Sequence, residues 1–460
     1  MTAPAFLSLS APTGDERALI EQMSTALELH NAQNVTAEAY YDGSHVAEAF
    51  GISTPPSMQN LHAVAGWPGT CVDVLEERLD WLGWSSDGDP FGLAQVYAQN
   101  GLDVDSGMAH LDALIFGVSF VTVGTGYDGE PNPLVTPHSP KSMTTLWDAR
   151  TRRASAALSV LNDDDGQPTE RTLYLSNETV RVAYSSGRWA VVDRDQHNLG
   201  RLPVVPVANR QRTSRQFGRS EITRAVRYYT DAAVRTLIGM EVHREFYNSP
   251  QRVALNVDEK AFQDAAGNPV SQWTSIQGRI WAIPPAEDGG ASPDVKQFTP
   301  SSPQPYIEQV KVQSQLLAAE AGIPASYLGF TTDNPASADA IRAGEARLVK
   351  RAERRQTTFS RSWMEVGRLA LLMRDGQVPD NYDASVSCRW RDAATPTRAA
   401  AADEVTKLTA AGIIPAESQV AMDRIGLGPA EQAKIMADRS RAALTSDMAL
   451  LAGAIGRQTA

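Results

Sequence analysis

The 460-residue sequence has few cysteines and no long apolar run, and each shortage excludes a class of protein. Only Cys71 and Cys388 are present, far apart in the chain, so a disulfide framework and a zinc knuckle are excluded. Two separate buried thiols are the favoured interpretation, with one long-range disulfide left open. Without a run of about 18 apolar residues or a secretory signal at the N-terminus, we expect no membrane span and a protein made and used in a cytosol.

Lysine is also scarce, since only seven of the 42 basic residues are lysine and 35 are arginine. With so much alanine, this usage indicates a GC-rich coding genome. The formal net charge is −12. This charge argues against a protein that grips nucleic acid by neutralising phosphates, but it does not exclude one that nucleic acid passes without sticking.

Catalytic motifs are missing too. The seven histidines never pair as H-x-x-x-H, and the sequence has no G-x-S-x-G and no G-x-x-x-x-G-K-[ST]. The acidic run Asp163–Gly166 lacks the ligand spacing of a calcium loop and is expected to be a hairpin turn. We therefore predict no catalytic residue, no cofactor and no metal site.

One glycine-rich loop, "GTGYDG" at Gly124–Gly129, formally matches a dinucleotide-binding motif and follows an expected strand. Pro131 and Pro133 follow it closely and prevent the helix whose N-terminus should hold the pyrophosphate. A turn is the favoured interpretation. A nucleotide-dependent enzyme using this loop is kept as an alternative.

The order of expected elements indicates an α+β protein that is mainly α, without internal repeats or βαβ units. Helices fill the first hundred residues, among them 15–41 and 68–82, and strands follow to about residue 210. A helix capped by Ser220 comes next, then short strands within 250–303, a helix ended by Gly322 and Pro324, a long helix, a strand and a tail of two or three small helices. Two helices that flank a small β module suggest a pair of struts.

The long helix is expected from Pro335 to Met373, with Asn334 as its N-cap and Pro335 at its first position. Its apolar positions run at near-heptad spacing from Ile341 to Met373, and a similar apolar seam runs along 222–240. Lys350, Arg351 and Arg354 form the strongest basic cluster, interpreted as a solvated or intersubunit face, with contact to nucleic-acid phosphates as the alternative.

Several strings, taken in order, make the chain resemble bacteriophage portal proteins of phages with long, non-contractile tails. They are "AEAYYDGSH", "AHLDALIFGVSFVTVG", "PVVPVANRQRTSRQFGRSEI", "AGIPASYLGF" and "NPASADAIRAGEARLVKRAE". Each string is weak by itself, but their order and spacing up to about residue 390 are specific.

The resemblance implies the portal fold, assembled as a ring of typically twelve subunits, to which both apolar seams would contribute contacts. It divides the chain as follows: wing 1–218, first stem helix 219–247, clip 248–302, second stem helix 303–325, tunnel loop 326–336, long wing helix and returning strand 337–394, and helical crown 395–460. The tunnel loop would face DNA with Gly329, Phe330, Thr331, Thr332, Asp333 and Asn334. Lys350, Arg351 and Arg354 would be channel or intersubunit residues.

The function implied by the resemblance is that of a channel at one capsid vertex, through which double-stranded DNA is packaged and ejected. The implied partners are the large terminase subunit, head-completion or adaptor proteins, and the major capsid and scaffolding proteins. The protein would belong to the virion, and to the host cytoplasm during assembly. A virion structural or adaptor protein without DNA passage remains the main alternative.

Overall fold

The structure is a computed structural model that describes residues 10–46, 62–85, 91–185, 187–247, 252–256, 294–297, 301–329, 337–394, 398–428 and 431–442. The chain divides into two compact units. The first unit comprises 1–45, 66–224 and 321–460, and the second comprises 46–65 and 225–320.

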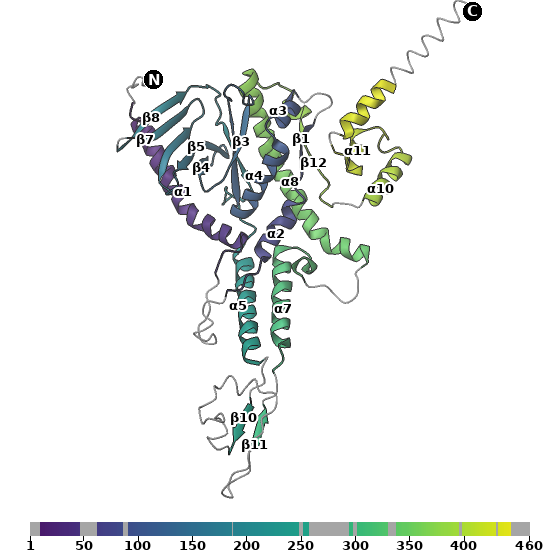
Figure 1. The fold of residues 1–460 in the computed structure, drawn as a ribbon. Coiled ribbons are helices and arrows are strands. Elements are labelled where there is room, and N and C mark those ends of the chain that lie inside the picture. The colour runs from purple at the N-terminus through teal and green to yellow at the C-terminus, as the bar shows by residue number, and fades with distance from the viewer. Residues whose placement is uncertain are drawn as a thin grey trace, which may run out of the picture. The chain divides into compact units, whose positions relative to one another are not determined.

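The first unit begins with helix α1, Gly14–Tyr41, which confirms the predicted first helix. Thr13 and Glu16 form a capping box, because the backbone N–H of each donates to the side chain of the other, at 2.9 and 3.3 Å. Ile20 and Met23 then face a sheet and are buried against Leu158 and neighbouring strand residues. Figure 1 shows α1 in purple along the strands β4 to β8.

Two antiparallel sheets follow. The strands β4 Met143–Asp148, β5 Arg153–Asn162, β6 Pro168–Tyr174, β7 Thr179–Ser185 and β8 Arg188–Asp195 form a meander in chain order. The three-stranded sheet has the order β3-β2-β9, from β2 Val118–Gly124, β3 Leu134–His138 and β9 Val204–Ala208. The predicted hairpin turn is confirmed, since Asp163 Oδ1 accepts the N–H groups of Asp165 and Gln167 at 3.1 and 2.8 Å.

The glycine-rich loop lies between β2 and β3, so a strand follows it where a dinucleotide site requires a helix. A Cβ on Gly126 would meet the carbonyl oxygen of Pro131 at 2.1 Å. The loop therefore turns back tightly on itself, as the turn interpretation predicted.

The second expected helix is shorter than predicted. Helix α2, Trp67–Glu76, ends before a strand that the sequence did not reveal, β1 Trp81–Ser85. Strand β1 pairs antiparallel with β12, Ser387–Trp390, about 300 residues later. Helices α3 Leu93–Gln99 and α4 Leu102–Phe116 follow β1 in the chain.

The long helix is α8, Ala338–Asp375, and its start differs from the prediction. Ser337 is the N-cap, and its hydroxyl accepts the N–H of Ala340 at 3.2 Å. The cap therefore lies three residues after Asn334, the expected cap, and the helix ends before Gly376, whose φ is 71°.

The apolar seam of α8 is buried inside the first unit, which corrects the expectation that it would make ring contacts. Leu348, Phe359 and Trp363 are at most 1% exposed, whereas Ile341 at the start of the seam is 52% exposed. The covering elements include β2, β9 and β12, and Trp84 Nε1 donates to the carbonyl of Trp363 at 3.0 Å.

The second unit contains helices α5 Arg224–Tyr247 and α7 Gln304–Ala321, side by side in Figure 1. Helix α5 begins four residues after Ser220, the expected cap, whose hydroxyl instead accepts the N–H of Ile222 at 2.9 Å in the preceding bend. Gln313 Nε2 donates to Thr236 Oγ1 at 3.2 Å between the two helices. Strands β10 Arg252–Leu255 and β11 Asp294–Gln297 lie between them in the sequence and pair antiparallel.

The C-terminal part of the first unit holds a short helix α9, Tyr382–Ser385, then α10 Arg398–Ala410 and α11 Gln419–Ile425, with a further helical segment over 431–442. Arg424 pairs with Glu404 between α11 and α10. The predicted tail of small helices is confirmed. None of the helices in the described ranges is long and apolar enough to span a bilayer.

Candidate functional site

The predicted tunnel loop lies mostly outside the described residues, which stop at 329 and resume at 337. Gly329 is described: with φ 88° it ends the 3₁₀ helix η3, Ala325–Leu328. Phe330, Thr331, Thr332, Asp333 and Asn334 fall in the undescribed stretch. Residues on each side of it meet at one side chain.

That side chain is Arg78, only 7% exposed, from the segment between α2 and β1. Its Nη2 lies 3.4 Å from the hydroxyl of Tyr327, before the undescribed stretch, and 3.3 Å from Glu345 Oε2, after it. Tyr327 in turn donates to Glu345 Oε1, and burial together with this carboxylate raises the pKa of Tyr327. Arg78 also donates through Nη1 to the carbonyl of Ala393 at 2.7 Å. We call Arg78, Tyr327 and Glu345 the Arg78 clamp.

Two turns further along α8, a second polar cluster surrounds Glu221, whose side chain is 2% exposed. Its Oε1 accepts from Arg355 at 2.5 Å and from Asn209 Nδ2 at 3.0 Å, and its Oε2 accepts from Arg351 at 2.6 Å. Burial by itself would raise the pKa of Glu221, but the two guanidinium groups outweigh burial and hold the pKa below its usual range. Glu221 is therefore ionised at neutral pH.

The backbone around this cluster is equally constrained. Asn209 donates its N–H to the carbonyl of Gly117 at 2.8 Å and accepts the N–H of Arg219 at 2.7 Å. Gly218 has φ +65°, and a Cβ there would meet the carbonyl oxygen of Asn209 at 2.1 Å. The cluster thus fixes to α8, within the first unit, the chain segment that leads to the start of α5.

The three residues of the predicted basic cluster, Lys350, Arg351 and Arg354, differ in their surroundings. Arg351 is 16% exposed and forms an ion pair with Glu221, so its charge is neutralised within the chain. Lys350 is 66% exposed and pairs with Glu353 at 2.7 Å, and Arg354 is exposed. The sequence did not reveal Arg78, Asn209, Glu221 or Arg355, because their partners lie far away in the chain.

Burial shifts the pKa values of one histidine and of both cysteines. His110 is fully buried, its Nε2 accepts from Trp363 Nε1 at 2.9 Å, and burial lowers its pKa to about 3. Both cysteines are free thiols, and burial raises the pKa of each to about 12. Within the described ranges, no group of three potential ligands is placed to hold a metal ion.

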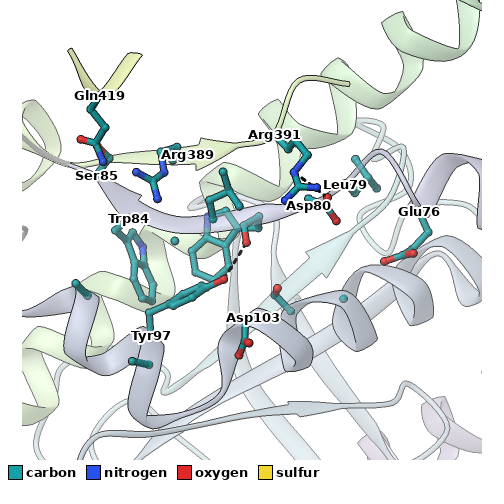
Figure 2. A pocket seen from close by; sticks show the side chains of 17 residues that line it. Glu76, Leu79, Asp80, Trp84, Ser85, Tyr97, Asp103, Arg389, Arg391 and Gln419 are labelled. Atoms are coloured by element: carbon teal, nitrogen blue, oxygen red, sulfur yellow. Dashed lines mark hydrogen bonds and ion pairs between the residues drawn. The ribbon is translucent and has the colours of Figure 1, made fainter. Parts of the chain in front are cut away.

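A cavity of about 840 Å³ lies beside β1 and β12 (Figure 2). Glu76, Asp80 and Asp103 contribute acidic groups, while Arg389 and Arg391 contribute basic ones. Asp80 pairs with Arg391 at 3.3 Å, and Tyr97 donates to the carbonyl of Trp81 at 3.0 Å. Burial and then the neighbouring carboxylates, Asp80 foremost, raise the pKa of Glu76 to about 6. The residues lining this cavity include neither histidine nor cysteine.

Comparison with known proteins covers nearly the whole chain. A family described as phage portal protein, SPP1 Gp6-like, matches residues 30–443. The portal protein of Mycobacterium phage D29 is 34% identical over 432 residues, which are 91% of this chain and 87% of the relative. The portal protein of Mycobacterium phage L5 is 33% identical over 431 residues, with the same coverage. A solved structure titled neck of native GTA particle, computed with C12 symmetry, matches 86% of this chain and 99% of its own at 14% identity and a TM-score of 0.40.

Proposed function

Because the chain belongs to the phage portal protein family, SPP1 Gp6-like, we propose that it assembles into a ring of twelve copies around a channel for double-stranded DNA. A portal protein stands at one vertex of the capsid, where DNA enters during packaging and leaves during ejection. The observation that carries this assignment is the match across residues 30–443, which includes both α5 and α7 and the whole of α8. The role we propose is structural and without catalysis.

The regions are assigned in the same proposal. Residues 1–218 and 337–394 form the wing, α5 and α7 the stem, 248–302 the clip, 326–336 the tunnel loop and 395–460 the crown. The grouping of 225–320 in one compact unit, together with 46–65, supports the stem and clip assignment. Val312 and Leu316, one turn apart on α7 and 53% and 47% exposed, support α7 as a helix that packs against a second copy.

The partners follow from the role. The clip docks the large terminase subunit during packaging and head-completion or adaptor proteins afterwards, while the wing meets the major capsid and scaffolding proteins. Assembly takes place in the host cytoplasm. These assignments rest on family membership alone.

Electron microscopy of the purified, negatively stained protein tests the proposal. We expect rings with a central hole, because identical head-to-tail contacts that close produce a ring. A monodisperse monomer at all concentrations, or closed particles without a hole, would contradict the assignment.

Deletion of Gly329–Asp333 tests the tunnel loop. We expect the rings to assemble, because the Arg78 clamp and the Glu221 cluster lie outside the deleted residues. Packaging or retention of DNA is expected to fall. DNA-filled heads at the wild-type level would exclude the loop as the DNA-facing element and favour an adaptor without DNA passage.

A further inference from the structure

A basic groove of about 610 Å³ lies between β4, β5, β9 and α8, in a chain whose formal net charge is −12. Four arginines line it, Arg152, Arg153, Arg201 and Arg361. Arg201 is neutralised by Glu365 at 2.6 Å. The other three are exposed and make no ion pair with any described residue. Three uncompensated positive charges therefore surround one hollow.

The lining of this arginine groove is partly apolar, and we call its residues Trp147, Leu202 and Val204 the apolar floor. Of these residues, Leu202 is 9% exposed. A groove with an apolar floor and a cationic rim fits a protein segment that carries an apolar side chain next to carboxylates. Duplex DNA offers phosphates at its surface but no apolar group to fill such a floor.

The opposite end of the five-stranded sheet carries a segment with an apolar side chain next to carboxylates. The β5–β6 hairpin exposes Leu161, 62% exposed, followed by Asp163, Asp164 and Asp165. Asp163 holds the turn through its own hydrogen bonds, which leaves Asp164 and Asp165 to point their charge outward from a rigid tip. We call Leu161 and Asp163–Asp165 the acidic tip.

The two features cannot meet within one chain. Arg153 begins β5 and Asn162 ends it, so the groove and the acidic tip are separated by a ten-residue strand, about 30 Å at the usual rise per residue. A contact between them requires two copies, and it joins two different surfaces of the same protein. Contacts of this head-to-tail kind are the ones that close into rings.

We propose that the acidic tip of each copy docks in the arginine groove of the next copy. This inference rests on the proposed ring and names one of its contacts: Asp164 and Asp165 face Arg152, Arg153 and Arg361, while Leu161 covers the apolar floor. Such contacts are partly exposed, so their strength falls with added salt.

Cross-linking tests the contact directly. In assembled rings of the Asp164→Cys/Arg153→Cys chain, a bismaleimide whose reach is far shorter than strand β5 can join the two thiols only between copies. We expect a ladder of covalent multimers in denaturing gels. The matched control is Asp164→Cys/Asp195→Cys, since Asp195 is exposed at the same end of the sheet as Arg153 but outside the groove. The wild-type chain, with its two native cysteines, sets the background.

A charge exchange keeps the test independent of cross-linker geometry. Asp164→Arg/Asp165→Arg is expected to shift ring dissociation to lower salt, and adding Arg153→Glu/Arg361→Glu is expected to restore it. The proposal is overturned by two results together, provided that the wild type forms rings. The cross-linked Asp164→Cys/Arg153→Cys chain runs as a monomer in denaturing gels, and Asp164→Arg/Asp165→Arg leaves the salt dependence of ring dissociation unchanged. The proposal is also overturned if only the arginine changes matter and they lower DNA content, because the groove would then bind DNA. A wild type without rings would instead contradict the proposed function.

Discussion

Two glycines of α8 lie in opposite surroundings. A Cβ on Gly367 would meet the hydroxyl of Tyr382 at 2.5 Å and the indole nitrogen of Trp84 at 2.8 Å, whereas nothing lies within 4 Å of a Cβ on Gly344. Glycine within a helix costs about 1 kcal/mol relative to alanine. At Gly367 that cost is offset, since the missing side chain lets α8 approach β1 and α9 closely.

The substitution pair Gly367→Ala and Gly344→Ala separates these effects. We expect Gly344→Ala to raise the free energy of unfolding by about 1 kcal/mol. Gly367→Ala should lower it, because overpacking costs about 1–3 kcal/mol and exceeds the gain in helix propensity. Thermal denaturation at equal protein concentration measures both. A Tm that rises for both variants would show that the packing around Gly367 gives way.

Glu221 is the second residue whose substitution gives a test of stability, through its carboxylate group. Glu221→Gln keeps the shape but leaves Arg351 and Arg355 buried without their counter-ion, at an expected cost of about 3–5 kcal/mol. Glu353→Gln is the control, because the pair of Glu353 with Lys350 is exposed and contributes about 0–1 kcal/mol. Urea unfolding of the two variants compares them.

The same variant predicts a pH dependence. The pKa of Glu221 is lowered in the folded chain, so its contribution is full above the ordinary pKa of a glutamate and is lost as the pH falls through the lowered value. The stability difference between wild type and Glu221→Gln should therefore shrink toward acid pH. A difference that stays constant from neutral to strongly acid pH would mean that the charge of Glu221 is not what stabilises the cluster.

At the scale of elements, local signals in the sequence predicted most of the helices and the strand-rich region before residue 210. The Thr13–Glu16 capping box and the apolar positions Ile20 and Met23 identify α1 from within a few residues. The turn at Asp163 is likewise closed by its own neighbours. Such elements are recognisable because their stabilising contacts are close in sequence.

Elements with distant partners were missed. Strand β1 has only five residues, too few to show an alternating pattern, and its pairing partner β12 lies about 300 residues away. The link of Asn209 to Arg355 spans 146 residues, and that of Arg78 to Tyr327 spans 249. No spacing rule relates such residues, so the candidate site emerged only from the fold.

The start of α8 gives a test at this scale, because the sequence and the structure name different caps. Ser337→Ala removes the hydroxyl that accepts the N–H of Ala340, and losing a cap costs about 0.5–2 kcal/mol. We expect faster amide hydrogen exchange over the first turn, residues 338–341, in Ser337→Ala and no change there in Asn334→Ala. The reverse result would restore Asn334 as the cap.

For the whole molecule, the question is whether the basic residues of α8 can act on DNA in the proposed ring, whose subunits each carry a formal charge of −12. Arg351 is committed to Glu221, whereas Lys350 and Arg354 face outward on the same helix. A role in the channel is therefore open to Lys350 and Arg354 but not to Arg351.

The variants Lys350→Ala/Arg354→Ala and Arg351→Ala distinguish the exposed basic residues of α8 from the buried one. The double variant should unfold like the wild type, within about 0.5 kcal/mol, because both side chains are exposed. Arg351→Ala should lose about 2 kcal/mol, the value of a hydrogen bond to a charged group.

If Lys350 and Arg354 line the channel, the double variant changes the DNA content of assembled heads at unchanged stability, since a weak attraction to the phosphates is lost. Heads that hold the wild-type amount of DNA would exclude both residues from the channel, and any defect of Arg351→Ala would then follow from its loss of stability alone.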